Sequence, residues 1–322
     1  MKMSKKFKVL LLENMDKKGI EFLSEKAEIF YVDKHDEETI TKALSGKDAV
    51  IKRDRGFITK KVLEKCPSLK AVGRHGVGLD TIDVKGAEEL GIYVVNTPHA
   101  NVEAVAEHNI ALMLAIAKPI LKVDKALRAG DWDYGHYLVG QELLGKKVGF
   151  IGLGKIGYRT AEICKIGFNM DVYYHDIIRN EKAEEKLGTR YVSVEELCKI
   201  SDFVVMALPL TKETENYFDK EKFDLMKPSS FFINNSRGPI VDEEALIDAL
   251  KGNKIAGAGI DVFAQEPPTK DNPLFKLDNV VVTPHSAANT KSAMVGMAMV
   301  AEDIIRILEG KEPKYPANNP KK

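Results

Sequence analysis

Cysteine is scarce in this chain of 322 residues: only Cys66, Cys164 and Cys198 occur, far apart and without the spacing of metal ligands. This scarcity argues against a disulfide framework and against a zinc-finger type of centre. It is typical of a protein that works in a reducing compartment. We therefore expect a cytoplasmic protein without a metal.

An excess of charge of either sign is missing as well, because 48 Lys and Arg residues balance 48 Asp and Glu residues. No overall field would hold a nucleic acid or an anionic membrane surface. Long apolar runs are also absent, since the longest, Ile110–Ala117, is far shorter than the roughly 20 residues that span a bilayer. The short apolar stretch Val9–Leu12 predicts a first strand and not a signal peptide. We expect neither a nucleic-acid partner nor a membrane partner.

The sequence does contain a regular alternation of short β-rich runs with polar segments of helix length. One series extends from FKVLLL to LKAVGR, and a second extends from KKVGFIGLG to NVVVTPH. Such alternation predicts parallel sheets with helical crossovers. Since 322 residues exceed what one core usually organises, we predict two α/β domains. A buried helix is predicted over Ala104–Ala117 and a last helix over Ala287–Leu308.

Residues 120–144 separate the buried helix from the second series and fit neither pattern. They place Trp132, Tyr134 and Tyr137 among polar residues and glycines without a clean period. Aromatic residues in such a stretch either belong to an extended arm that reaches a neighbouring subunit or pack on the chain's own surface. The sequence leaves both alternatives open.

A glycine turn carries the first functional signal. The segment KKVGFIGLGKIG places Gly152, Gly154 and Gly157 in the spacing G-x-G-x-x-G, directly after a predicted strand and at the start of a helical pattern. These glycines permit a tight turn, the close approach of a pyrophosphate and close packing of the helix on the strand. Unpaired N–H groups at the start of the helix favour an anion. Taken singly, the same glycines would also suit a purely structural turn.

The strand after this turn supplies a second signal. It ends in Asp176, 19 residues after Gly157, where an acidic side chain accepts hydrogen bonds from ribose hydroxyls. A carboxylate at this position repels a 2′-phosphate. Strand, turn, helix and acidic residue together predict a dinucleotide site that prefers NAD over NADP.

Three later strands are each followed by charged or titratable residues. Arg237 follows FFIN, Asp261 and Glu266 follow AGAGI, and His285 follows VVV. Ligands bind beyond the carboxyl ends of such strands. Oxidation of a hydroxy acid needs a hydride acceptor, a base for the hydroxyl proton and a cation for the carboxylate. We predict that Arg237 binds the carboxylate and that His285, oriented by Glu266, acts as the acid–base group.

Together, the segments GLGKIG, NNSRGPIVDEEAL, GIDVFAQEPP and TPHSAA resemble the D-isomer-specific 2-hydroxyacid dehydrogenase family, and the likeness extends over nearly the whole chain. It implies an NAD-dependent oxidoreductase that interconverts a short 2-oxo acid and its D-2-hydroxy acid. It also implies two doubly wound parallel sheets. One is a Rossmann NAD-binding domain over residues 101–288, and the other is a flavodoxin-like substrate-binding domain over residues 1–100 and 289–322. A homodimer through the NAD-binding domain is the family's usual form.

The resemblance assigns roles to individual residues. Arg237 would bind and polarise the substrate, Glu266 would pair with the imidazole, and His285 would carry the proton. The substrate contacts that it implies are Arg53, Gly76, Val77, Gly78, Asn101 and Arg237. The cofactor contacts that it implies are Val77, Gly152, Gly154, Lys155, Ile156, Gly157, Asp176, Leu208, Asn235, Ser236, Asp261 and Ala288.

Two substrates are compatible with this resemblance. The segment GRHGVGLDTID looks most like phosphoglycerate dehydrogenases, which is our first interpretation, although the chain ends without their common C-terminal extension. Asp54 stands where that subfamily tends to have a small hydroxyl residue, and its charge would repel a phosphorylated substrate. Glyoxylate and hydroxypyruvate reductases tolerate such a loop and provide the alternative. Arg53 and Arg55 favour an anionic substrate again.

Two other functions share the architecture. An NADH-sensing, corepressor-like binding protein would need partner-binding features that this sequence does not display. A formate dehydrogenase typically has a glutamine at the position of Glu266. We therefore predict an enzyme that acts on the CH–OH group of its donors.

Overall fold

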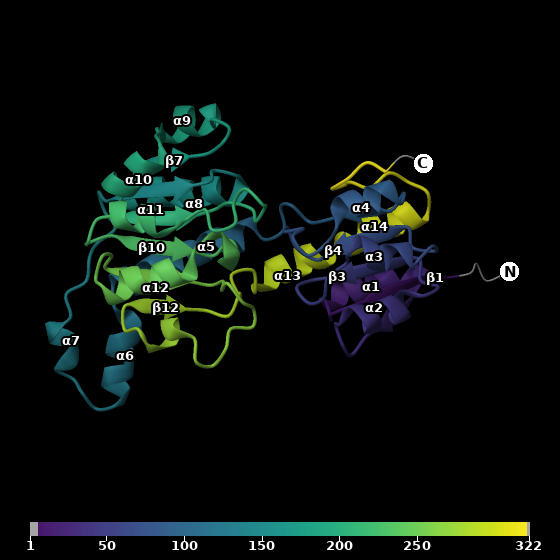
Figure 1. The fold of residues 1–322 in the computed structure, drawn as a ribbon, viewed down its shortest axis with the longest axis horizontal. Coiled ribbons are helices and arrows are strands. Elements are labelled where there is room, and N and C mark those ends of the chain that lie inside the picture. The colour runs from purple at the N-terminus through teal and green to yellow at the C-terminus, as the bar shows by residue number, and fades with distance from the viewer. Residues whose placement is uncertain (1–5, 321–322) are drawn as a thin grey trace. The chain divides into compact units, whose positions relative to one another are not determined.

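The structure is a computed structural model that describes residues 6–320, and these residues form two compact units. Unit 1 contains the described residues up to Asn101 and those from Asn289 onward, and unit 2 is Val102–Ala288. Each unit is built on its own parallel sheet with helices on both faces (Figure 1).

Unit 1 has five parallel strands in the order β2-β1-β3-β4-β5, which is the flavodoxin-like order. Its two cores lie on opposite faces of the sheet, because successive strand residues point to opposite sides. Val9 and Leu11 of β1 join the core under α1, α13 and α14, whereas Leu10 joins the core under α2, α3 and α4. The elements are β1 (Phe7–Leu11), α1 (Lys17–Lys26), β2 (Ala27–Tyr31), α2 (Glu37–Leu44), β3 (Ala49–Lys52), α3 (Lys60–Glu64), β4 (Ala71–Arg74), α4 (Val84–Glu89), β5 (Tyr93–Val95), α13 (Lys291–Ala298) and α14 (Val300–Leu308).

Unit 2 has seven parallel strands in the order β12-β11-β10-β9-β6-β7-β8, which is the Rossmann order with one added strand. Helices α5, α8 and α9 cover one face, and α10, α11 and α12 cover the other. The order in which successive strands are added to the sheet reverses at β6: β7 and β8 lie on one side of it and β9 to β12 on the other. The carboxyl end of β6 leads into the glycine turn. The elements are α5 (Val102–Ala117), α6 (Ile120–Arg128), α7 (Tyr134–Tyr137), β6 (Lys147–Ile151), α8 (Lys155–Phe168), β7 (Asp171–His175), α9 (Glu181–Leu187), β8 (Arg190–Tyr191), α10 (Val194–Ile200), β9 (Phe203–Met206), α11 (Lys220–Leu225), β10 (Phe231–Asn234), η1 (Gly238–Ile240), α12 (Glu243–Lys251), β11 (Gly257–Ile260), η2 (Pro273–Lys276) and β12 (Val280–Val282).

The predicted fold class is confirmed, but one predicted helix is wrong. In place of a single last helix over Ala287–Leu308, the structure has α13 and α14, which are separated at Met299. The first of them begins only at Lys291, because the Thr290 side chain accepts the N–H of Ala293 and caps the helix there. Among the described helices, none is both long and apolar enough to cross a membrane.

The segment after α5 forms a projecting arm, defined here as residues 120–139. Its helices α6 and α7 extend away from the sheet of unit 2 (Figure 1), and neither contains a buried residue. Trp132 is 70% exposed, Tyr137 82% and Val139 93%. Trp132 and Tyr137 are therefore not packed on the surface of unit 2, and a contact of this arm with a neighbouring subunit stays a prediction.

Candidate active site

The glycine turn joins β6 to α8, and two of its glycines are required by close contacts. A Cβ atom at Gly152 would lie 2.5 Å from the Ala207 carbonyl oxygen, and a Cβ atom at Gly157 would lie 2.7 Å from the Gly152 oxygen. Gly152 also has a φ of 95°, which side chains rarely permit. A Cβ atom at Gly154, in contrast, would have nothing within 4 Å. The backbone at Gly154 is therefore open to a ligand.

The start of α8 and the end of β7 lie beside this open position. The N-cap residue of α8 is Gly154, which has no side chain to accept the N–H groups of the first turn. Asp176 follows β7 directly, and its Oδ2 atom accepts the N–H of Leu153 at 2.7 Å. A cradle without a side chain at a helix N-terminus fits a pyrophosphate, and the adjacent carboxylate fits a ribose. The residues present therefore fit a dinucleotide.

Three neighbouring strands place the predicted catalytic residues on adjacent loops. Strands β10, β11 and β12 are consecutive in the sheet, and Arg237, Glu266 and His285 lie on the loops at their carboxyl ends. His285 Nδ1 lies 2.7 Å from Glu266 Oε2. The other oxygen of this carboxylate, Oε1, accepts the N–H of Phe263 at 3.1 Å. Since the pair uses Nδ1, acid–base chemistry of His285 would run at Nε2.

Gly238 holds the loop of Arg237 against the loop of Glu266. A Cβ atom at Gly238 would lie only 1.8 Å from the Phe263 carbonyl oxygen. Only glycine therefore allows the two loops to approach this closely. The Arg237 guanidinium donates to the backbone carbonyl oxygen of Ser236 at 2.7 Å. The side chain of Asn234, which the sequence analysis did not single out, donates to the Arg237 carbonyl at 3.1 Å.

Asp261 shapes the loop that carries His285. Its buried carboxylate accepts the Thr283 hydroxyl at 2.6 Å, the N–H of Ser286 at 2.8 Å and the N–H of Ala287 at 3.0 Å. His108 in turn lies 3.0 Å from the Thr283 hydroxyl. The carboxylate of Asp261 is thus surrounded by groups of the loop that carries His285, and its predicted contact with the cofactor stays a prediction. Thr283 and His108 were not predicted for the site, and only the tertiary structure reveals them.

The other predicted cofactor contacts differ in their surroundings. Asn235 is buried and donates to the Val105 carbonyl at 3.2 Å, which ties the end of β10 to α5. Leu208 packs against the core on the α10 to α12 face. Lys155 is exposed, and Ile156, Ser236 and Ala288 are half-buried.

The predicted substrate residues of unit 1 lie on the loops after β3 and β4. Glu13 Oε2 accepts three successive N–H groups, those of residues 53 to 55, at 2.8 to 3.0 Å. This contact fixes the loop that carries Arg53.

Arg74 donates to the Gly78 carbonyl at 2.7 Å, which fixes the second loop. In the second loop, Val77 accepts a hydrogen bond from Asn96, and Gly76 has a φ of 143°. The Asn101 side-chain oxygen is buried without a hydrogen-bond partner among residues 6–320.

Two buried basic side chains adjoin these loops. Burial, reinforced by Arg53 and Arg74, lowers the pKa of His75 to about 4. Burial, reinforced by Arg74, lowers the pKa of Lys52 to about 8. The Lys52 ammonium donates to the Thr81 hydroxyl at 2.5 Å. His75 is therefore a neutral imidazole near neutral pH, and Lys52 remains largely charged.

The described part of the chain contains no cluster of three or more His, Cys, Asp or Glu side chains that could hold a metal ion. Its three cysteines are buried and unpaired. Unit 2 thus has its own set of polar groups around His285, and unit 1 has a separate set around Arg53.

Comparison with known proteins identifies relatives of the whole chain. A model of the D-isomer specific 2-hydroxyacid dehydrogenase NAD-binding domain matches residues 110–287. Glyoxylate reductase from Pyrococcus furiosus is 40% identical over 95% of this chain and 94% of its own length. D-3-phosphoglycerate dehydrogenase from Archaeoglobus fulgidus is 38% identical over 97% of this chain, which spans 59% of that enzyme.

Solved structures give the same result. An NADPH-dependent glyoxylate/hydroxypyruvate reductase from Sinorhizobium meliloti, in complex with NADP and malonate, superimposes with a TM-score of 0.88. It is 28% identical, and the match covers 97% of both chains. The predicted resemblance and the predicted nicotinamide cofactor are confirmed by these matches.

Proposed function

This chain belongs to the D-isomer-specific 2-hydroxyacid dehydrogenase family, and we propose that it interconverts a short 2-oxo acid and its D-2-hydroxy acid. The observation that carries this proposal is the His285–Glu266 pair, whose Nδ1 and Oε2 atoms lie 2.7 Å apart and whose loops follow β12 and β11, at the same edge of the sheet as the loop of Arg237. An imidazole oriented by a carboxylate, together with a guanidinium at the same edge of the sheet, provides the proton and the anion binding that the reaction requires.

In the direction of reduction, the Arg237 guanidinium binds the substrate and polarises its carbonyl group. When bound, the reduced nicotinamide supplies the hydride to the carbonyl carbon. His285 then donates the Nε2 proton to the carbonyl oxygen, which becomes the hydroxyl group of the product. Glu266 stabilises the protonated imidazole before this transfer and keeps its ring in place through Nδ1. The reverse reaction uses neutral His285 as the base.

We propose NAD as the cofactor because Asp176 adjoins the glycine turn. Its carboxylate is held by the N–H of Leu153 at 2.7 Å, and a 2′-phosphate would have to approach this fixed negative charge. The relative from S. meliloti is in complex with NADP, so the fold by itself does not fix the choice of cofactor, and the proposal rests on Asp176. The remaining cofactor contacts proposed above retain their roles.

In unit 1, we propose that Arg53, Asn101 and the backbone of residues 76–78 bind the substrate. The buried, unpartnered oxygen of Asn101 supports this role, because buried polar groups without partners usually face a ligand or water. Two substrate types are candidates, the phosphoglycerate type and the glyoxylate or hydroxypyruvate type. Both types occur among the relatives, at 40% and 38% identity.

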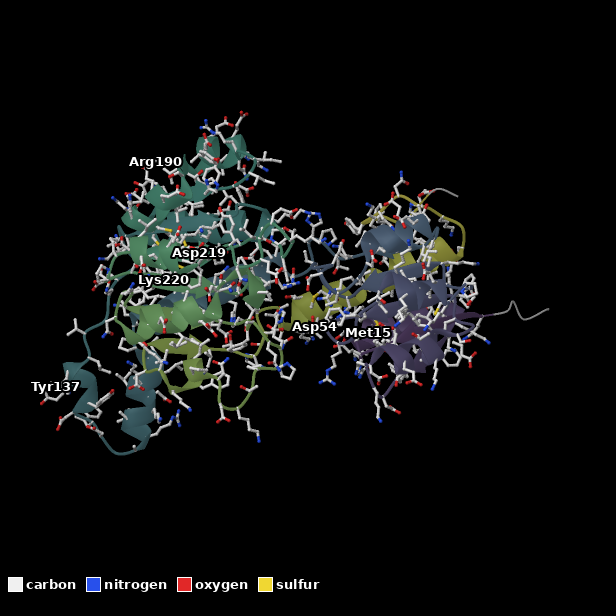
Figure 2. All side chains as sticks on the ribbon, in the orientation of Figure 1. Met15, Asp54, Tyr137, Arg190, Asp219 and Lys220 are labelled. Carbon is white, nitrogen blue, oxygen red and sulfur yellow. The ribbon has the colours of Figure 1, made fainter. Side chains whose placement is uncertain are left out.

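We further propose that the enzyme is a cytoplasmic homodimer that assembles through unit 2 and has no membrane or nucleic-acid partner. The projecting arm supports dimerisation, since it exposes Leu127 and Trp132 by 54% and 70%. Monomeric proteins rarely leave such a cluster in water. Figure 2 shows the side chain of Tyr137 on α7 directed away from the sheet of unit 2.

The test is a substrate panel with purified enzyme. Oxidation of NADH is followed by its absorbance in the presence of glyoxylate, hydroxypyruvate, pyruvate or 3-phosphohydroxypyruvate. Buffer without a 2-oxo acid is the blank. We expect at least one 2-oxo acid to be reduced, with D-configured product. If folded enzyme that binds NADH reduces none of them, the proposed function is wrong.

A further inference from the structure

Two arginine side chains of unit 1 converge on one carboxylate of the same chain. Arg74 Nη2 lies 3.0 Å from Asp54 Oδ1, and Arg53 Nε lies 3.1 Å from Asp54 Oδ2. Asp54 is labelled in Figure 2. Two guanidinium groups that meet at one point form a strong site for an anionic ligand group. In this protein the point is occupied by the chain's own side chain.

The arginines and the loop that carries Asp54 are fixed by other contacts. Arg74 is held by the Gly78 carbonyl at 2.7 Å and Arg53 by the Asn289 side chain at 2.6 Å. The side chains of Arg74 and Arg53 are only 8% and 20% exposed. Glu13 holds the backbone of Asp54 at 2.8 Å. The guanidinium groups therefore cannot easily turn toward a second anion elsewhere.

Charges of both signs surround Asp54. Lys52, Arg53 and Arg74 are the cations, and the three carboxylates of Glu13, Asp54 and Asp80 act on the same cluster. A further anion would meet the Asp54 carboxylate at the point where the two guanidinium groups converge. Like charges brought together in this way repel each other, so a phosphate or a second carboxylate is disfavoured.

Buried hydrogen-bonding groups, in contrast, are available near Asp54, and one of them, His75, is neutral. Arg74 Nη1 and both ring nitrogens of His75 are buried without a hydrogen-bond partner among residues 6–320. The imidazole of His75 is neutral near neutral pH because its pKa is lowered to about 4. A neutral imidazole both donates and accepts, which matches a hydroxyl group.

We propose that Asp54 is a specificity-determining residue: it fills the anion position between Arg53 and Arg74 and restricts the substrate to 2-oxo acids without a second anionic group. Hydroxypyruvate, whose tail ends in a neutral hydroxyl group, is the substrate type that this arrangement favours. The inference rests on the proposed function and on the role of Arg53 in binding the substrate.

The experiment compares kcat/KM for hydroxypyruvate and 3-phosphohydroxypyruvate in four proteins. These are the wild type, Asp54→Asn, which keeps the shape, Asp54→Ser, which empties the position, and Asp33→Asn. The last is the control, because Asp33 is exposed and its replacement changes the net charge equally. We expect the wild type and the control to prefer hydroxypyruvate, and we expect Asp54→Ser to raise the phosphorylated-to-neutral ratio at least about tenfold. Asp54→Asn should give an intermediate ratio.

Two results would overturn the inference: a wild type that prefers the phosphorylated substrate, or a ratio that is unchanged in both Asp54 variants. The first result needs only the wild type, so it can be obtained even if the variants do not fold. Thermal unfolding shows whether each variant is folded. If no protein reduces any 2-oxo acid, the proposed function fails, and calorimetric titration of NADH-loaded enzyme with inorganic phosphate replaces the kinetics. Tighter phosphate binding by about tenfold in Asp54→Ser than in the wild type supports the inference, and equal binding overturns it.

Discussion

His285 has a backbone conformation that its neighbours impose. Its φ is 49°, a conformation that costs a non-glycine residue about 1 to 3 kcal/mol unless the surroundings hold it. The His285 N–H donates to the Asp261 carbonyl at 2.7 Å, and the ring is held by Glu266. An imidazole fixed at both its backbone and its ring is suited to proton transfer at Nε2, the ring nitrogen that Glu266 does not bind.

Replacement of His285 by alanine should lower kcat by about 10²- to 10⁴-fold, because the reaction loses its acid–base group. Binding of NADH, measured by its fluorescence, should change little. Glu266→Gln should give a smaller loss of kcat, since the ring keeps a hydrogen-bond partner without the charge. Unchanged turnover in His285→Ala would remove this residue from the mechanism.

Asp176→Ala should reduce the preference for NADH over NADPH, since the carboxylate that repels the 2′-phosphate is removed. We expect the ratio of the two kcat/KM values to fall at least about tenfold. Asp171→Ala is the matched control, because Asp171 is exposed at the opposite end of β7. A variant as selective as the wild type would show that another residue reads the ribose.

His75 should make the folded protein sensitive to acid. Its folded pKa of about 4 lies below its ordinary value of 6.5, so the unfolded chain binds more protons between these values. The free energy of unfolding should therefore fall as the pH decreases from 6.5 toward 4. In His75→Gln this fall should be smaller by about 1 to 3 kcal/mol. Urea unfolding at several pH values measures it, and an identical pH dependence in the variant would contradict the prediction.

At the scale of elements, the strand–turn–helix unit from β6 to α8 separates binding from stability. Gly157 is needed for the packing of α8 on the turn, whereas the space around Gly154 is open. Glycine is thus needed at the two positions for different physical reasons: at Gly157 for packing and at Gly154 for access of a ligand.

We expect Gly154→Ala to weaken NADH binding by about tenfold or more while the free energy of unfolding stays within about 0.5 kcal/mol of the wild type. Gly157→Ala should instead lower the free energy of unfolding by about 1 to 3 kcal/mol, because its Cβ atom overlaps the Gly152 carbonyl. Chemical unfolding and NADH titration of both variants test this. Equal effects on stability would show that the two positions are not distinct.

At the scale of the whole molecule, the projecting arm is the part that a single chain does not explain. The arm exposes Leu127, Trp132 and Tyr137 by 54%, 70% and 82%. An apolar cluster on a projecting element is typical of a surface that a partner covers.

Leu127→Asp combined with Trp132→Ser should therefore shift the enzyme from dimer to monomer, as measured by sedimentation velocity at several concentrations. The control is Ile166→Asp, which places a charge at a 75% exposed apolar residue of α8, away from the arm. A wild type that sediments as a monomer, or a double variant that stays dimeric, would contradict the proposed assembly.

Much of this protein follows from the sequence by itself. The alternation of β-rich and helical segments determined both α/β sheets, and the glycine spacing with Asp176 identified the nicotinamide cofactor. These signals depend on residues close together along the chain, because turn geometry, strand periodicity and helix starts are local properties. The start of the last helix was predicted too early because the Thr290 cap, which is also a local signal, was overlooked.

The tertiary structure decided what depends on contacts between distant residues. The sheet order makes the loops of Arg237, Glu266 and His285 neighbours, and burial turns Asp261 into the support of the His285 loop. The charge of Asp54 could be read from the sequence, but its two arginine partners could not, because Arg74 lies on another strand. Burial and electrostatic neighbours arise only when separate strands pack together, and here they distinguish a general anion site from one that is already filled.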